Sequence, residues 1–391
     1  MRVEYSERQP DIYVLLLGWA TRDRARDLLR QRADLLIARA KVDGRDDSTV
    51  GVVYDAIAAP HCAAALLEVA VGHRHLKGTR GQLVGVRTPG FRNVKTSGAS
   101  AAGIHVVTEE LSNSTLAYSN IAVLKLFRKV DGGVHPDFAI GDFLTRRDFK
   151  HAPTVAGALE YRRPRSLPIV VGVLQRFIPH DGNGWDYTLR MLDRFSREVR
   201  GQPEPTPAVT LSADVLLTAS EHGLPEQAEE RLADYVPVAR RLGELTGQMH
   251  RVLGSAAHSH LAPEPFSSFY QRSAYQSLRG MTCSVIDALR AELPRLPAGL
   301  QPNAARVIAS QDRLLEHFRG ILGRKLIAMR IACHGNYHLQ QVLCTEGDFT
   351  IIDLWGRAAA AALRAETQAL PSGRHRIDGA LVPLRGPRRL D

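Results

Sequence analysis

The sequence predicts a mixed α+β fold in which strands dominate the first part of the chain and helices the second. Short β-branched runs such as Ile169–Phe177 occur before residue 180. After residue 230, apolar residues recur at helical spacing. A third observation is a hairpin pattern near the end, where the apolar runs Gln341–Cys344 and Phe349–Ile352 flank a turn that contains Gly347.

Composition places the chain among globular proteins. It has 391 residues, of which 44% are hydrophobic and 24% charged, enough for two or three domains. No apolar run approaches the roughly 20 residues of a membrane-spanning helix, and Tyr13–Ala20 has no signal-peptide cleavage pattern. The four cysteines are scattered, so we expect free thiols and a cytoplasmic location, with no membrane partner.

The net charge of +10 raises the question of a nucleic-acid partner. Residues 356–391 hold seven Arg against three acidic residues, so +4 of the +10 lies in this tail. The remaining charge is mixed in sign, and no basic run is interleaved with aromatic residues. This pattern is typical of a solvated surface, and we expect no nucleic-acid partner.

The first hundred residues predict a small unit of strands and helices. Ile12–Trp19 is an expected strand, and Arg22–Val42 has a weak helical period. Val52–Ile57 is another short, mostly apolar run. A second helix is expected from Pro60, because proline is favoured in a first helical turn.

A lysine inside an apolar strand is the first candidate functional residue. Ile104–Val107 and Ile121–Phe127 are expected strands, and Lys125 lies within the second one. The small polar residues between these strands could let the backbone approach a phosphate, or could form a plain turn. Lys125 could likewise be an edge lysine that reaches solvent, or a residue that binds nucleotide phosphates.

Helices are expected in the second half. A helix follows the lysine strand over His135–Leu144, and another opens at Trp185 after a Gly-rich turn. Apolar spacing predicts further helices at residues 232–252, Tyr275–Leu293 and Val307–Leu322.

The hairpin near the end carries a second set of candidates. The polar cluster His334, Asn336 and His338 precedes it, and the second strand ends on Asp353. A hairpin brings its outer ends together, so Asn336 and Gln341 could face Asp353. Amide and carboxylate oxygens are ligands that Mg²⁺ accepts beside nucleotide phosphates. The alternative from spacing alone is an ordinary hairpin with a solvent-facing aspartate.

These residues lie in two motifs, His-Gly-Asn-Tyr-His-Leu-Gln-Gln-Val-Leu from His334 and Ile-Ile-Asp-Leu-Trp-Gly-Arg from Ile351. They resemble His-Gly-Asp-Tyr-His-Leu-Gly-Gln-Val-Leu and Ile-Ile-Asp-Phe-Glu-Gly-Glu-Pro of the maltokinases. That family belongs to the aminoglycoside-phosphotransferase/protein-kinase-like superfamily and includes the maltokinase domains fused to trehalose synthase. The resemblance covers about residues 1–353.

The resemblance implies a bilobal protein-kinase-like α+β fold. Residues 1–100 would form part of an N-terminal cap domain, 101–180 the N-lobe and hinge, and 181–356 a mostly helical, incomplete C-lobe with the catalytic loop. Residues 357–391 depart from the family and are expected to be a poorly ordered tail. On this comparison the chain is expected to be truncated at both ends, with the tail an out-of-register translation or the end of a shortened gene.

The resemblance also implies roles for particular residues, with ATP and Mg²⁺ as cofactors. Lys125 would hold the α- and β-phosphates, and Gln341 with Asp353 would hold Mg²⁺. Asn336 stands at the position of the catalytic aspartate, beside His334. The phosphate loop would contain Ser112, Asn113 and Ser114, and backbone near Gln175 and Phe177 would bind adenine. The implied reaction converts maltose and ATP to maltose 1-phosphate and ADP, with a trehalose synthase as a possible partner.

Two departures from the family predict reduced or absent turnover. Asn336 can accept a hydrogen bond but cannot act as a base. Ala139 stands where the family has the glutamate that pairs with the lysine, and Asp142, three residues on, is the available substitute. The alternative function is therefore a non-catalytic kinase-like module. A zinc site of Cys333, His334 and His338 is disfavoured because the spacing fits no common zinc motif.

Overall fold

The computed structural model describes most of the chain. The described residues are 1–5, 10–41, 50–72, 74–94, 103–107, 113–200, 226–257, 261–323, 326–354 and 381–383. The chain divides into two compact units, Met1–Leu253 with His334–His375, and Gly254–Cys333 with Arg376–Asp391. Apart from the strand at 381–383, the tail expected at residues 357–391 lies outside the described residues.

The first unit begins with two small antiparallel sheets. One contains β1 (Arg2–Val3), β2 (Asp11–Tyr13) and β11 (Lys129–Val130) in that order. The other has the order β3-β5-β4 and is covered by α1. Its elements are β3 (Leu17–Thr21), α1 (Arg22–Gln31), β4 (Leu36–Lys41) and β5 (Val50–Asp55).

Two sequence expectations are wrong in this region. The strand expected over Ile12–Trp19 is divided into β2 and β3. The helix expected over Arg22–Val42 ends at Gln31, and its last part forms β4, which pairs with β5. A short apolar run fits the helical period as well as the strand period, and here pairing with β5 makes the segment a strand.

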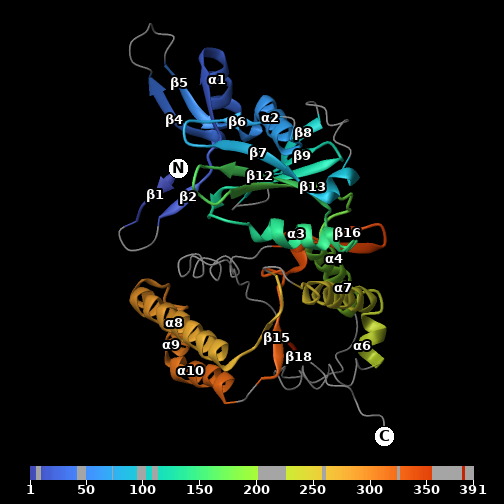
Figure 1. The fold of residues 1–391 in the computed structure, drawn as a ribbon. Helices are drawn as coiled ribbons and strands as arrows, with labels where there is room; N and C mark the ends of the chain where they lie inside the picture. The colour runs from blue at the N-terminus through green and yellow to red at the C-terminus, as the bar shows by residue number, and fades with distance from the viewer. Residues whose placement is uncertain are drawn as a thin grey trace. The chain divides into compact units, whose positions relative to one another are not determined.

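A seven-stranded antiparallel sheet is the main element of the first unit (Figure 1). Its order is β6-β7-β12-β13-β10-β9-β8. The strands are β6 (Leu76–Lys77), β7 (Gln82–Arg87), β8 (Ile104–Val107), β9 (Asn113–Tyr118), β10 (Ala122–Phe127), β12 (Val155–Arg162) and β13 (Ile169–Arg176). The predicted mixed fold class is confirmed, as are the strands expected at β8, β10 and β13.

One helix covers each face of this sheet. On one face lies α2 (Pro60–Ala70), where the Tyr118 hydroxyl donates to the carbonyl of Ala63 at 2.9 Å. A side chain on Gly85 would meet the backbone of α2, so this position requires glycine. On the other face lies α3 (Pro136–Arg146), which packs on β12. The sheet core is closely packed, with Leu116, Leu124 and Leu174 fully buried.

The remaining elements of the first unit are mostly helical. They are α4 (Gly184–Val199), α6 (Glu226–Arg231), α7 (Val236–Gly254) and the hairpin of β16 (Val342–Thr345) with β17 (Asp348–Ile351). Short 3₁₀ turns in this unit lie at Ala33–Leu35, Ala56–Ala58, Pro89–Asn93 and Leu339–Gln341. The predicted hairpin is therefore present, with Gly347 at a φ of 72° in its turn.

In its described residues, the second unit contains three helices and a small sheet. The helices are α8 (Ser268–Glu292), α9 (Gln301–Ala309) and α10 (Gln311–Arg319), with 3₁₀ turns at Leu293–Arg295 and Gly320–Leu322. The sheet contains β14 (Glu264–Pro265), β15 (Ala328–Arg330) and β18 (Leu381–Pro383). The helix expected over Val307–Leu322 is thus divided, because α9 ends at Ala309 and α10 begins at Gln311.

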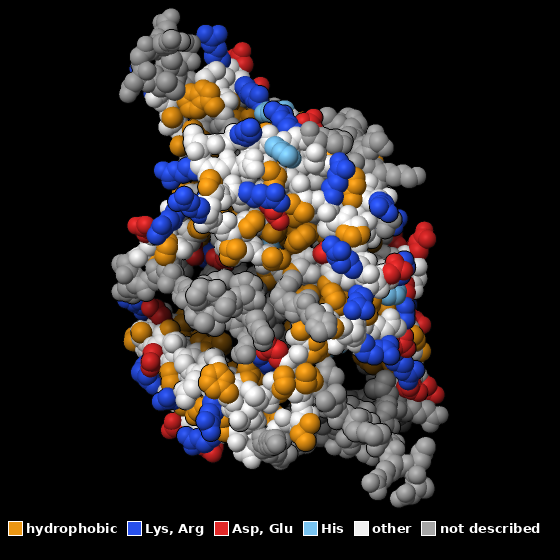
Figure 2. Space-filling model, in the orientation of Figure 1, with side chains coloured by type: hydrophobic (Ala, Val, Ile, Leu, Met, Phe, Trp, Pro, Cys, Tyr) orange, Lys and Arg blue, Asp and Glu red, His pale blue; other side chains and the backbone are white. Residues whose placement is uncertain are grey.

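The surface charges and the cysteines agree with what the composition indicates. On the face shown in Figure 2, Lys and Arg side chains are interspersed with acidic and apolar ones. All four cysteines are free thiols, as expected. None of the helices in the described parts of the chain combines the length and apolar character needed to cross a membrane.

Candidate functional site

A buried lysine stands at the centre of the candidate site. Lys125 lies on β10 between β9 and β13, opposite Thr115 and Val173, and is 5% exposed. Its ammonium group forms an ion pair with Asp353 and lies 3.3 Å from a carboxylate oxygen of Asp137. A buried charge is costly unless it is paired, so these contacts explain how a lysine occupies the strand. The hydroxyl of Thr115, on the same sheet face, is buried without a hydrogen-bond partner.

Asp137 is the residue that sequence reasoning missed. It lies in the first turn of α3, is 1% exposed, and its carboxylate forms no hydrogen bond. The expected substitute, Asp142, instead binds Arg146 at 2.7 Å, so the pairing of Asp142 with Lys125 is wrong. The missed signal was an acidic residue in a first helical turn, two positions before Ala139.

His135 fixes the start of α3 and thereby Asp137. Its Nδ1 accepts a hydrogen bond from the backbone N–H of Asp137 at 3.3 Å, and its ring stacks on Phe127 at 3.5 Å. Burial, with a contribution from the nearby Lys125 charge, lowers the pKa of His135 to about 3. The imidazole is therefore neutral at pH 7 and can accept the helix-capping hydrogen bond.

The segment expected to form a phosphate loop, with Ser112, Asn113 and Ser114, is in part a strand. Asn113 and Ser114 belong to strand β9, and Ser112 lies outside the described residues. Ser114 points to the sheet face opposite Lys125, because alternate strand residues face opposite sides. Its hydroxyl accepts a hydrogen bond from Arg128 at 2.7 Å.

The residues expected to supply the adenine-binding backbone lie in β13 and directly after it. Gln175 lies within β13 and pairs with Val123 on one side and Val155 on the other. The N–H of Phe177 donates to the carbonyl of Ile121 at 3.0 Å. That N–H is therefore not a free donor for a nucleotide base.

His334 holds the loop that precedes the hairpin. It is 2% exposed, and its Nε2 donates to the carbonyl of Ile352 at 2.7 Å. Its Nδ1 accepts the N–H of Asn336 at 3.4 Å, and Gly335 between them has a φ of 82°. Burial lowers the pKa of His334. Both ring nitrogens of His334 contact backbone atoms, which ties the loop to the end of the hairpin.

Asn336 projects from this loop and is exposed. Its side-chain amide lies 3.3 Å from Nε2 of His338. An amide can orient a hydroxyl through a hydrogen bond but cannot take its proton.

Gln341 and Asp353 lie together at the open end of the hairpin. The N–H of Ile352 donates to the carbonyl of Gln341 at 2.9 Å, and Asp353 follows directly. Asp353 has a φ of 55°, a strained conformation of the kind that concentrates at functional sites.

The side-chain oxygen of Gln341 is buried and lacks a hydrogen-bond partner. An unsatisfied amide oxygen is a ligand that a hard cation such as Mg²⁺ accepts. Across the described ranges, no three His, Cys, Asp or Glu residues are grouped as metal ligands, and this gives no support to a zinc site. Water and phosphate oxygens would complete the coordination of Mg²⁺.

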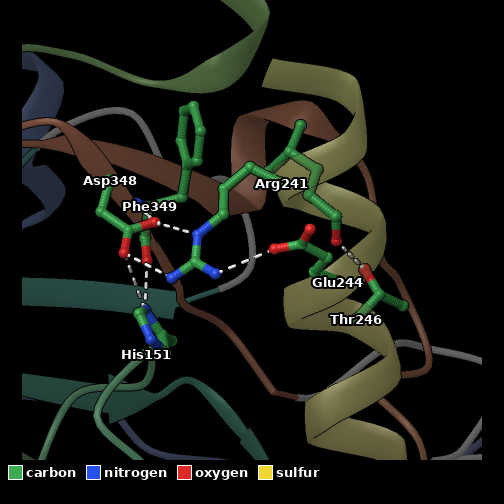
Figure 3. Close-up of polar contacts among 7 residues, drawn as sticks. His151, Arg241, Glu244, Thr246, Asp348 and Phe349 are labelled. Carbon is green, nitrogen blue, oxygen red and sulfur yellow. Dashed lines mark hydrogen bonds and ion pairs between the residues drawn. The ribbon is translucent and has the colours of Figure 1, made fainter. Parts of the chain in front are cut away.

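The closed end of the hairpin is held by a polar cluster (Figure 3). Arg241 of α7 donates to both carboxylate oxygens of Asp348, at 2.9 and 2.7 Å, and to Glu244 at 3.1 Å. Hydrogen bonds from Arg241 lower the pKa of Asp348. Nδ1 of His151 lies 3.1 Å from the carbonyl of Phe349.

The two edges of the hairpin are also held. On the β17 side, the N–H of Ile351 donates to the carbonyl of His151 at 2.8 Å. On the β16 side, Cys344 exchanges backbone hydrogen bonds of 2.9 Å with Asp181 and Gly182. The hairpin is therefore fixed along its length by segments distant in sequence.

No protein-family model matches the chain. It is similar to solved structures of glucosamine kinase at 18% sequence identity. For the structure with glucosamine, ADP and inorganic phosphate, the TM-score is 0.46 and the match covers 87% of this chain. The match covers 63% of the length of that glucosamine kinase chain. Crystal form B gives a TM-score of 0.48, covering 95% of this chain and 75% of the other. All these scores lie below 0.5, so they carry no conclusion about activity.

Proposed function

We propose that the chain is a kinase-like phosphotransferase that binds ATP with Mg²⁺ and acts on a sugar hydroxyl, with maltose as the first candidate substrate. The observation that carries this proposal is the buried Lys125 between Asp137 and Asp353. Nucleotide phosphates need a fixed cation, and the metal that accompanies them needs hard oxygen ligands. The choice of maltose rests on the resemblance of the His334 and Ile351 motifs to maltokinases.

Each residue has a role in this proposal. Lys125 binds the nucleotide phosphates, and Asp137 keeps its ammonium group in place. Gln341 and Asp353 would hold Mg²⁺, which would neutralise charge on the transferring phosphoryl group. Asn336 accepts a hydrogen bond from the sugar hydroxyl. The hydroxyl oxygen then bonds to the γ-phosphorus, the bond to the departing ADP breaks, and the hydroxyl proton passes to water.

Asn336 favours slow turnover and supports a second candidate function. Without a base at this position, transfer loses a contribution of roughly 10²- to 10⁴-fold. The chain would then be a nucleotide-binding module, or a partner of a trehalose synthase, rather than an enzyme.

An ADP-release assay with ATP, Mg²⁺ and maltose, glucose or glucosamine tests the proposal. We expect Asn336→Asp to raise kcat by about 10²-fold or more, and Asn336→Ala to give no increase. Nucleotide binding without ADP release in either the unmodified protein or Asn336→Asp would favour the binding module. Absence of nucleotide binding would contradict both functions.

A further inference from the structure

The two candidate metal ligands lie at one end of the hairpin, and the ion pair between Arg241 and Asp348 lies at the other. Gln341 precedes β16 and Asp353 follows β17. Asp348 is the first residue of β17, three strand residues from Ile351 and therefore roughly 10 Å along the strand. Asp348 cannot contact a metal ion held by Gln341 and Asp353, so any effect it has on that site must pass through the hairpin.

The contact at the closed end has the geometry of a specific anchor. Arg241 and Asp348 meet through two parallel hydrogen bonds of 2.9 and 2.7 Å. Bidentate pairs of this kind fix orientation as well as distance. The two side chains are about one-third exposed, at 34% and 32%, so the pair is formed at the border of the packed region.

The same helix also contacts the loop that carries Asn336. Thr246 lies five residues after Arg241 on α7, and its hydroxyl is 3.1 Å from the hydroxyl of Tyr337. One helix thus holds both the hairpin and the loop before it. Movement of the hairpin against α7 would change the separation of the two segments.

The structure assigns to Arg241 a positioning role: we propose that its bidentate contact with Asp348 sets the hairpin so that Gln341 and Asp353 can share one divalent cation beside a nucleotide. This inference rests on the proposed function. Helix α7 would then influence cation binding although it contributes no residue to the candidate metal site.

The test compares ADP binding by calorimetry with and without Mg²⁺. In Arg241→Ala, we expect the Mg²⁺-dependent gain in ADP affinity to fall by about three- to tenfold, below the 10- to 100-fold typical of residues that touch a metal ligand directly. ADP affinity without Mg²⁺ should stay unchanged, because Lys125 is untouched. Arg240→Ala is the matched control, since Arg240 is the neighbouring residue on α7 and pairs with Glu229 instead.

Two further variants separate positioning from a general loss of structure. Asp348→Ala removes the same contact from the hairpin side and should reproduce the effect. The exchanged pair Arg241→Asp with Asp348→Arg restores opposite charges and should recover most of the gain. Hydrogen exchange should be faster over Val342–Ile351 in Arg241→Ala and normal in the exchanged pair.

Two outcomes overturn the inference and remain distinguishable. If Arg241→Ala keeps the full Mg²⁺-dependent gain, or the exchanged pair recovers none of it, Arg241 does not position the metal ligands. If the unmodified protein binds no ADP under either condition, the proposed function is wrong and the inference falls with it.

Discussion

Replacing Lys125 tests the electrostatic organisation of the candidate site. Lys125→Met removes the buried charge and leaves the carboxylate of Asp137, which is 1% exposed, without a counter-charge. Breaking a buried ion pair by removing one partner costs about 3–5 kcal/mol. Asp353 contributes less to this loss because its side chain is 21% exposed and water can solvate it.

The double variant Lys125→Met with Asp137→Asn decides whether the cost comes from the stranded carboxylate. Coupled residues in contact typically show interaction energies of about 0.5–3 kcal/mol. We therefore expect the double variant to regain about 1–3 kcal/mol relative to Lys125→Met, because no buried charge remains unpaired.

Urea unfolding measures these differences. With a slope of about 2 kcal/mol per molar urea, Lys125→Met should lower the midpoint by about 2 M. Lys150→Met is the control, since Lys150 forms an exposed pair with Asp148 and its loss should cost less than about 1 kcal/mol. A double variant that is less stable than Lys125→Met would refute the buried pairing of Lys125 with Asp137.

Two further predictions concern the start of α3. The pKa of His135 in the folded protein, about 3, is below its ordinary value, so the unfolded state takes up the proton first as pH falls. The free energy of unfolding should therefore fall as the pH drops below 6.5. Between pH 7 and pH 5, the unmodified protein should lose about 2 kcal/mol more of this free energy than His135→Asn, which keeps a capping acceptor. Equal losses in urea unfolding would contradict a neutral His135 in the folded protein. Asp137→Asn should weaken ADP binding without Mg²⁺ by about tenfold, because Lys125 loses a charged contact. Asp142→Asn should have no effect. Equal losses of ADP affinity in calorimetry would show that Asp137 is not the carboxylate that holds Lys125.

Residues whose position is fixed by local pattern could be predicted from the sequence. Lys125 was recognisable because a lone charge in an apolar strand needs a partner. Asp353 was recognisable because a hairpin brings its outer ends together. The structure brings these two residues into contact.

Other features depend on contacts between distant segments and left no local signal. Arg241 and Asp348 are 107 residues apart in sequence, and no spacing rule connects them. The sequence of β4 fits a helical period, but pairing with β5, rather than that period, determines its conformation. Asn113 and Ser114 resembled a loop, yet their backbone pairs with Phe127 and Leu126 of β10. In each case a tertiary contact outweighed composition.

The Mg²⁺ dependence of ADP binding is the most direct test of the central claim, that Lys125 and the Gln341–Asp353 end of the hairpin together hold a metal-bound nucleotide. Calorimetric titration of the unmodified protein should show binding that strengthens when Mg²⁺ is added, and Lys125→Met should abolish it. ADP binding that is indifferent to Mg²⁺, or that persists in Lys125→Met, would contradict the account.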